Sequence, residues 1–305
     1  MYDVIIIGGG PAGFSSALYA SRGKLNTLLI EREFSGGQMA TTNEMENYPG
    51  FEDPISGPDL ARRMENQAKR FGTKVVNEGV IDVELNQIIK TVKTRESIYQ
   101  SKTVILCMGA YPRELGVPNE KELRGSGVSF CATCDGAFFK GMEVAVVGGG
   151  NTAAQDALFL TRFCNRVFLI HRRDNLKATK VIQDAVLSNK KIELIWNSTV
   201  KEIIGDSKVT GIRIKNVKTG EEKQVAINGV FVAIGNIPNT GLVKNKIETN
   251  EAGYIITDDN MQTNIFGVYA AGDIREKPLR QVITAASDGA VAAYMAEIYI
   301  RENSR

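Results

Sequence analysis

Short apolar runs separated by longer mixed segments mark the start of this chain. The predicted strand Asp3 to Ile7 is apolar and β-branched after its first residue and leads directly into a glycine turn. The segment from Pro11 to Arg22 has the composition of a helix, and a second apolar run, Thr27 to Ile30, ends in Glu31. Continuous apolar runs are typical of parallel strands that are covered on both faces. The pattern therefore predicts a strand-helix-strand unit at the N-terminus.

The same pattern returns in the middle of the chain. Residues 143–147 and 166–170 are each a charged residue followed by an apolar run, and the segment between them predicts a glycine turn and a helix that ends near Phe163. Two such units in one chain indicate an internal repeat. The predicted fold class is α/β, with two Rossmann-like dinucleotide-binding domains.

The order of the segments predicts that one domain is inserted into the other. Proline-containing stretches at Pro112 and Pro238 flank the second unit, and residues 267–273 return to a strand, a glycine and an acid. We expect a discontinuous first domain and a continuous second one, with these bounds: residues 1–113 and 240–305 for the first, and residues 114–239 for the second.

Composition excludes several classes of function. The chain has 305 residues and is 43% hydrophobic, which is enough for two cores of ordinary size. Its formal net charge of +2 is spread along the chain, so we expect no nucleic-acid partner. No apolar run approaches the ~20 residues of a membrane span, and the first strand follows the N-terminus without a leader pattern. We therefore expect no membrane partner and a cytoplasmic protein.

Two glycine turns are the candidate nucleotide-binding loops. Glycines allow the tight turn and let backbone N–H groups approach a pyrophosphate at the start of a helix. One such turn is a weak signal, but two that each follow an apolar strand and open a helix are strong together. The candidate residues are Gly8, Gly10, Pro11, Ala12 and Gly13 in the first turn, and Gly148, Gly150, Asn151 and Thr152 in the second.

The residue at the end of the second strand distinguishes the two turns. Glu31 lies 23 residues after Gly8, and His171 lies 23 residues after Gly148. A carboxylate bonds a ribose hydroxyl and repels a 2′-phosphate, so the first site should take FAD or NAD. Arg172 and Arg173 follow His171 and can bind a 2′-phosphate, so the second should prefer NADP. The alternative is that these arginines are simply an exposed strand end.

Cys131 and Cys134 form a Cys-x-x-Cys pair just before the second turn. In a reducing compartment such a pair is catalytic or metal-binding more often than structural. The chain has one such pair and one histidine, so we expect no metal site. We predict a redox dithiol at the start of a short helix, whose N-terminus would stabilise a thiolate.

Asp135 and the two remaining cysteines complete the candidate chemistry. Asp135 is the candidate general acid and base, which requires a raised pKa; the alternative is a helix-capping carboxylate. Cys107 and Cys164 are expected to be small buried residues.

Several further segments carry a resemblance to a known family. The chain resembles the low-molecular-weight, bacterial-type thioredoxin reductases over essentially its whole length. Besides the two glycine turns and the Cys-x-x-Cys-Asp sequence, the matching residues are Gly36-Gly37-Gln38, Glu46-Asn47-Tyr48-Pro49-Gly50, Ala271-Gly272-Asp273 and Arg280-Gln281.

The resemblance implies a complete electron path. FAD would be held by the first and last segments, with Asp273 on the ribityl chain and Arg280-Gln281 along the isoalloxazine. NADPH would bind the inserted domain, with Lys177 among the residues that hold it together with His171, Arg172 and Arg173. Cys134 would face the flavin, and Cys131 would attack the disulfide of a thioredoxin or thioredoxin-like protein. A homodimer built on the FAD domains is also implied.

Departures from the family pattern keep other interpretations open. Lys177 stands where a further arginine is usual, Gln155-Asp156 stands where two glutamates are common, and Asn236 replaces a frequent histidine. One alternative keeps the flavoprotein dithiol chemistry but takes ferredoxin or NADH as donor, or another small redoxin or peroxidase-linked protein as acceptor. A flavin-binding sensor without turnover is a third possibility, against which the retained dithiol argues.

Overall fold

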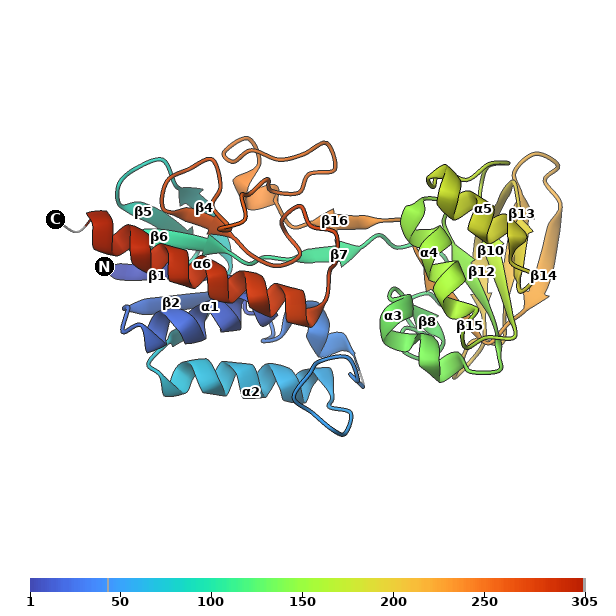
Figure 1. The fold of residues 1–305 in the computed structure, drawn as a ribbon, viewed down its shortest axis with the longest axis horizontal. Helices are drawn as coiled ribbons and strands as arrows, with labels where there is room; N and C mark the ends of the chain where they lie inside the picture. The colour runs from blue at the N-terminus through green and yellow to red at the C-terminus, as the bar shows by residue number, and fades with distance from the viewer. Residues whose placement is uncertain (43, 304–305) are drawn as a thin grey trace. The chain divides into compact units, whose positions relative to one another are not determined.

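The computed structural model describes residues 1–42 and 44–303, which form two compact units. Unit 1 consists of Met1–Tyr111 and Ile237–Arg305, and unit 2 consists of Pro112–Asn236. The chain leaves unit 1 through β7 (Ala110–Pro112) and returns through β16 (Asn236–Pro238) (Figure 1). These two strands pair with each other as a separate two-stranded sheet.

The sheet of unit 1 is mainly parallel around its centre. The strand order is β3-β2-β1-β6-β5-β4, and β17 also pairs with β6. Five of these strands run parallel to one another, and two extend the sheet beyond β6 as an antiparallel meander. The parallel strands are β1 (Tyr2–Ile7), β2 (Thr27–Glu31), β3 (Lys74–Asn77), β6 (Ile98–Leu106) and β17 (Val268–Ala270), and the meander strands are β4 (Val80–Glu84) and β5 (Lys90–Thr94).

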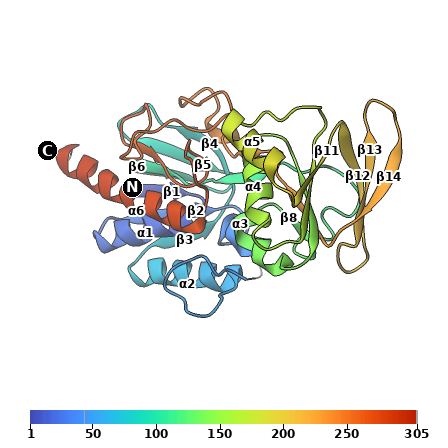
Figure 2. The same ribbon diagram turned by 45° about the vertical axis from the view of Figure 1, so that its right-hand side comes forward.

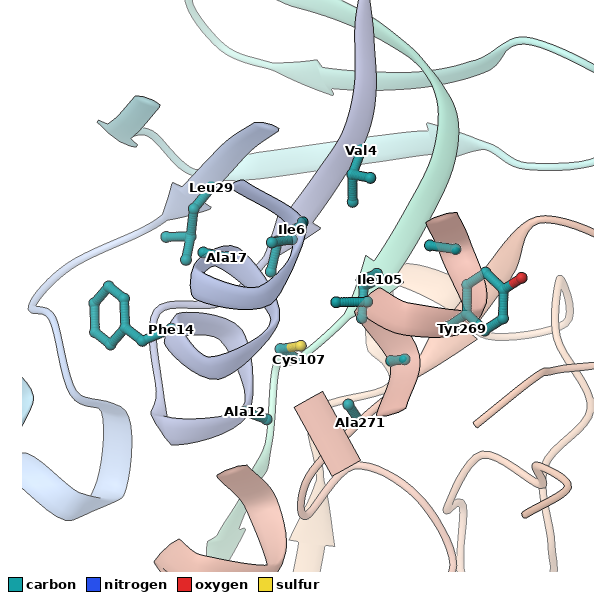
Figure 3. Close-up of a cluster of buried hydrophobic side chains, with 14 of the residues drawn as sticks. Val4, Ile6, Ala12, Phe14, Ala17, Leu29, Ile105, Cys107, Tyr269 and Ala271 are labelled. Atoms are coloured by element: carbon teal, nitrogen blue, oxygen red, sulfur yellow. The ribbon is translucent and has the colours of Figure 1, made fainter. Parts of the chain in front are cut away.

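Two helices pack on each other over this sheet. α1 (Pro11–Arg22) lies beside the long C-terminal α6 (Val282–Asn303), and α2 (Gly57–Arg70) lies on the far side of α1 from α6 (Figure 1). Gly289 permits the close approach of α6, because a Cβ there would lie 2.1 Å from the carbonyl oxygen of Ala12. Figure 3 shows Cys107 between Ala12 and Ala271 in the buried cluster beneath these helices. Fully buried aliphatic side chains in such a core contribute about 2 kcal/mol each.

Unit 2 contains a five-stranded sheet in which all neighbours are parallel, in the order β11-β10-β9-β15-β8. α4 and α5 pack side by side on one face of this sheet (Figure 2), and a three-stranded antiparallel sheet, β12-β13-β14, completes the unit. The parallel strands are β8 (Val128–Ser129), β9 (Glu143–Val147), β10 (Arg166–Ile170), β11 (Ile192–Ile195) and β15 (Gly229–Val232). The other elements are α3 (Ala132–Asp135), α4 (Asn151–Leu160), α5 (Lys180–Ser188), β12 (Ser198–Ile204), β13 (Gly211–Asn216) and β14 (Glu222–Ala226).

The predicted α/β class with two Rossmann-like folds is confirmed, and the differences are local. The second helix of the repeat ends at Leu160 and not near Phe163. The backbone N–H of Phe163 bonds the carbonyl of Leu160, three residues back, so the chain leaves the helix through a tightened turn. The ammonium of Lys191 satisfies the carbonyls of Thr161 and Cys164 there. No helix within residues 1–42 and 44–303 has the length and apolar character needed to cross a membrane.

Candidate functional site

The first candidate site lies at the carboxyl edge of the unit 1 sheet. β1, β6 and β17 are parallel, so the residues that follow them meet at one edge. Gly8 follows β1, Cys107 follows β6, and Gly272 comes two residues after β17. In open α/β sheets, ligands bind outside the carboxyl ends of the strands. The topology thus places two predicted cofactor residues, Gly8 and Gly272, at the expected edge.

The glycines of the first turn have different physical tasks. Gly8 has φ +108°, and a Cβ on it would lie 2.5 Å from the carbonyl oxygen of Cys107. A Cβ on Gly13 would lie 1.8 Å from the carbonyl oxygen of Gly8. A Cβ on Gly10, by contrast, would meet nothing closer than the Gly36 carbonyl at 4.0 Å. Gly8 and Gly13 are therefore required by the fold. The absence of a side chain at Gly10 instead leaves room for a ligand at the start of the helix.

The N-terminus of α1 has the features of an anion-binding site. Its N-cap is Gly10, Pro11 opens the first turn, and neither a capping side chain nor an acidic residue satisfies that turn in the described structure. α2 shows the ordinary alternative, because Ser56 accepts the N–H of Asp59 at its start. The uncapped N–H groups of α1 carry partial positive charge and can bind a phosphate.

Glu31 is fixed beside this turn. Its Oε2 accepts the N–H of Gly9 at 2.6 Å, and its Oε1 accepts the N–H of Arg32 at 2.8 Å. These bonds hold the carboxylate at the end of β2, next to the glycine turn. A carboxylate oxygen has further lone pairs, so Glu31 can still accept a ribose hydroxyl.

Segments far apart in sequence assemble around the same turn. The N–H of Gly36 bonds the carbonyl of Gly9 at 2.7 Å, which brings Gly37 and Gln38 of η1 (Gly37–Thr41) against the turn. The amide of Asn47 donates to the side-chain oxygen of Gln281 at 3.0 Å, across 234 positions of sequence. Two of the segments chosen on resemblance thus contact each other.

A buried carboxylate that the sequence analysis missed supports the Gly272 turn. Asp288 in α6 accepts the N–H of Gly272 at 3.0 Å and the ammonium of Lys277 at 2.8 Å. The Lys277 side chain is only 4% exposed, so the pair is shielded from solvent. The contact with the turn depends on the packing of α6, which the sequence does not indicate.

The second candidate site lies at the carboxyl edge of the unit 2 sheet. Gly148 follows β9, and His171 follows β10, which runs parallel to β9. A Cβ on Gly149 would lie 2.2 Å from the His171 ring, so this glycine allows the ring to pack on the turn. Nothing lies within 4 Å of a Cβ on Gly150, and α4 begins there without a capping side chain or first-turn acid among the described residues. This helix start has the same anion-binding character as that of α1.

The basic residues surround this second turn. Arg172 and Arg173 are exposed directly after β10, and burial together with these two charges lowers the pKa of His171. The backbone N–H of Lys177 bonds the carbonyl of Gly149 at 2.6 Å. The Asn151 side chain accepts the N–H of Thr179 at 2.7 Å, and Thr152 follows it in the first turn of α4. The segment carrying Lys177 is thus tied to the glycine turn, which the sequence alone did not indicate.

The predicted dithiol is a disulfide at the start of α3. Cys131 and Cys134 are bonded, with their Cα atoms 5.3 Å apart. Cys131 is the N-cap, and its carbonyl accepts the N–H groups of Cys134 and Asp135. The predicted short helix is present, but it has a single turn. A single turn has a small dipole, so the expected stabilisation of a thiolate by this helix is modest.

Asp135 does not cap a helix with its side chain, which removes the structural alternative considered for it. Its Oδ2 accepts the hydroxyl of Ser129 at 2.6 Å. Burial raises the pKa of Asp135, and the bond from Ser129 partly opposes that rise. A raised pKa is what a carboxyl group needs to exchange protons near neutrality.

Cys107 and Cys164 are buried free thiols, as predicted. Burial raises the pKa of Cys107 to about 12 and that of Cys164 to about 11. Neither thiol forms a thiolate near neutral pH, so both act as small core residues.

Comparison with known proteins decides the family. The profile of the family described as "Pyridine nucleotide-disulphide oxidoreductase" matches residues 2–289. The chain belongs to this family. It is similar to the thioredoxin reductase of Peptoclostridium acidaminophilum, with 50% identity over 99% of this chain and 98% of that one. It is also similar to the thioredoxin reductase of Bacillus subtilis (strain 168), with 48% identity over 99% and 96% of the two chains.

A solved structure extends the likeness to three dimensions. The crystal structure of thioredoxin reductase from Streptococcus pyogenes MGAS5005 matches with a TM-score of 0.93 and 46% identity, covering 99% of both chains. The resemblance drawn from the sequence is thereby confirmed. A pyridine nucleotide-disulphide oxidoreductase of this type uses a flavin and a pyridine nucleotide.

The residues of unit 1 fit such a flavin nucleotide. Asp273 Oδ1 and Arg280 Nε are buried and have no hydrogen-bond partner among the described residues. The Arg280 guanidinium lies 4.1 Å from the centre of the Tyr254 ring, which fixes its orientation. Burial raises the pKa of Asp273. Buried polar atoms usually have partners, so these two are suited to contact a bound group.

The glycines of this oxidoreductase provide a first prediction. Gly13→Ala should lower the free energy of unfolding by about 3 kcal/mol, because the new methyl group overlaps the Gly8 carbonyl. Gly10→Ala should change it by less than about 1 kcal/mol while it lowers flavin occupancy. Urea unfolding of both proteins after removal of bound nucleotide measures the difference. Equal stability of the two variants would contradict the assignment.

Proposed function

We propose that this chain is an NADPH-dependent thioredoxin-disulfide reductase that uses FAD. The observation that carries the proposal is the Cys131–Cys134 disulfide beside a half-buried Asp135, in the same unit as a phosphate-binding turn followed by two arginines. Relatives that carry the name thioredoxin reductase match the chain over nearly its whole length, which supports it.

We assign FAD to unit 1, which we propose as the FAD-binding domain. The first turn of α1 would bind its pyrophosphate, and Glu31 would accept a ribose hydroxyl. Asp273 would bond the ribityl chain, and Arg280-Gln281 would lie along the isoalloxazine, with Asn47 orienting Gln281 through their bond. When bound, FAD accepts a pair of electrons from the nicotinamide and supplies them to a disulfide.

We assign NADPH to unit 2, as the NADPH-binding domain. The first turn of α4 would bind the pyrophosphate, and Arg172 and Arg173 would bind the 2′-phosphate with charge-assisted bonds. Lys177 would add a point charge from the segment that its backbone ties to the turn. His171 would stay neutral, because its pKa is lowered, and would support the turn through its packing on Gly149.

The cysteines would transfer the electrons to the partner protein. The Cys131–Cys134 disulfide takes up two electrons and two protons and becomes a dithiol. Cys131 loses its proton and attacks the thioredoxin disulfide, whose S–S bond breaks as a mixed disulfide forms, and the thioredoxin sulfur that is released takes up that proton. Cys134 then loses its proton to Asp135 and attacks Cys131, which restores the internal disulfide and releases thioredoxin as a dithiol. Asp135 returns the proton to the departing sulfur, so the enzyme dithiol is oxidised and the thioredoxin disulfide is reduced.

A steady-state assay tests this proposal and separates the alternatives. The purified protein is given a bacterial thioredoxin in its disulfide form, with NADPH, NADH or reduced ferredoxin as donor. We expect turnover with NADPH at a kcat/KM at least about tenfold above that with NADH, since a 2′-phosphate bond is charge-assisted. Turnover with ferredoxin alone, or with a different small redoxin in place of thioredoxin, would overturn the donor or acceptor assignment.

We also propose that the enzyme is a cytoplasmic homodimer built on the FAD domains. A dithiol that cycles between reduced and oxidised forms suits a reducing compartment. Light scattering on the eluted protein checks the oligomeric state, for which a mass of twice the 33.3 kDa of one chain is expected.

A further inference from the structure

Ser129, at the end of β8, joins the two functional groups of the dithiol site. Its Oγ lies 2.6 Å from Oδ2 of Asp135 and accepts the backbone N–H of Cys131 at 3.1 Å. The same oxygen lies 3.4 Å from the carbonyl of Cys131. Ser129 is 5% exposed, so little water competes for these bonds. One buried hydroxyl thus contacts both the carboxyl group and the backbone that carries the first sulfur.

The Ser129 hydroxyl can form a hydrogen bond with Asp135 in both protonation states of the carboxyl group. When Asp135 is ionised, Ser129 donates its hydrogen to the carboxylate. When Asp135 is protonated, the carboxyl group can donate to Ser129, whose hydrogen then turns toward the Cys131 carbonyl. The N–H of Cys131 keeps its bond to Ser129 in both states. The carboxyl group therefore has a partner at the same place before and after each proton transfer.

We propose that Ser129 is a positioning residue that holds Asp135 through its proton cycle and keeps the carboxylate available as a base. The inference rests on the proposed role of Asp135 in thiol-disulfide exchange. It extends that role, because it assigns the control of the acid-base group to a residue outside the Cys-x-x-Cys-Asp sequence.

The main packing partners of α3 among the described elements are η2 (Gly136–Phe139), which has no charged residue, and α4, which contributes Asp156. Burial raises the pKa of Asp156 to about 6. The thiols of Cys131 and Cys134 titrate once the disulfide is reduced. The hydrogen bond from Ser129 opposes the burial of Asp135, so its loss should raise the pKa of Asp135 further.

The test is the pH dependence of the exchange step. Prereduced enzyme is mixed anaerobically with a bacterial thioredoxin disulfide, and the rate is measured across pH. Asp135 must be ionised to accept the proton of Cys134, so the rate falls as pH drops through its pKa. Ser129→Ala should move this fall upward by about one pH unit, the size expected for one hydrogen bond to a charged group. Ser129→Thr, which keeps the hydroxyl, should retain the wild-type profile.

Three control variants identify the group whose titration causes the fall in rate, which appears as an inflection in the pH profile. Asp135→Asn should abolish it, whereas Asp156→Asn should leave it in place. Ser101→Ala is the matched control, because Ser101 is also a buried serine whose hydroxyl bonds a carbonyl two residues ahead. If Asp135→Asn keeps the wild-type inflection, the proposed role of Asp135 fails and the role of Ser129 fails with it. If Asp135→Asn abolishes the inflection and Ser129→Ala does not move it, the Ser129 inference alone is overturned.

Discussion

Cys134→Ser is expected to reduce thioredoxin turnover by at least about 1000-fold, because it removes one of the two sulfurs that carry the electron pair. Cys131→Ser should have the same effect, since a single thiol can neither close the internal disulfide nor complete the exchange. Reduction of the flavin by NADPH should persist in both variants, because it precedes the disulfide in the proposed path. Parallel assays of thioredoxin turnover and of flavin bleaching measure the two steps separately.

Cys164→Ala is the matched control for these substitutions. Cys164 is a buried thiol with a pKa raised to about 11, and it lies in the same unit. Its replacement by a residue of similar size should leave turnover near the wild-type level. If either serine variant kept turnover within about tenfold of wild type, the loss expected for a missing nucleophile would be absent and the dithiol path would be wrong. A flavin-binding sensor without turnover would then be the better interpretation.

Removal of both arginines after β10 is expected to have the second largest effect. Arg172→Ala combined with Arg173→Ala should lower kcat/KM for NADPH by about 10- to 100-fold, since charge-assisted bonds to a phosphate are lost at an exposed site. KM for NADPH should rise while kcat stays nearly constant. The reason is that the 2′-phosphate is far from the reacting nicotinamide and is bound equally in the ground and transition states. Turnover with NADH should change little.

Arg166→Ala supplies the control for charge. Arg166 is exposed and begins β10, whereas Arg172 and Arg173 follow the other end of that strand. Its loss changes the net charge by one without touching the glycine turn. The double variant could lose activity equally with NADPH and NADH, or Arg166→Ala could lower kcat/KM for NADPH as much as the double variant does. Either result would show that Arg172 and Arg173 do not bind the 2′-phosphate.

The parts of the site that depend on short sequence spacing could be predicted. In each unit, the first glycine of the turn and the residue at or just after the end of the next strand lie 23 positions apart, as Gly8 and Glu31 do, and a strand-helix-strand unit fixes their proximity. The disulfide between Cys131 and Cys134 is likewise local. These predictions needed only the periodicity of apolar residues and the chemistry of the side chains.

The contacts that support the site could not be predicted, because they depend on packing. Ser129 precedes Asp135 by six positions, and only the turn from β8 into α3 brings their side chains together. Asp288 reaches Gly272 because α6 lies against α1, which Gly289 allows. The single turn of α3 and the early end of α4 are set by local hydrogen bonds that composition does not reveal.

The central claim is that electrons enter from NADPH and reach the disulfide through a flavin. An anaerobic titration tests it most directly: NADPH is added to the purified protein, NADH is added to a second sample, and the visible absorption band of the flavin is followed. We predict rapid bleaching at near-stoichiometric NADPH and much less bleaching at the same amount of NADH. If neither nucleotide bleached a flavin that dithionite reduces normally, the nucleotide assignment of unit 2 would be contradicted and the electrons would have to come from a protein donor.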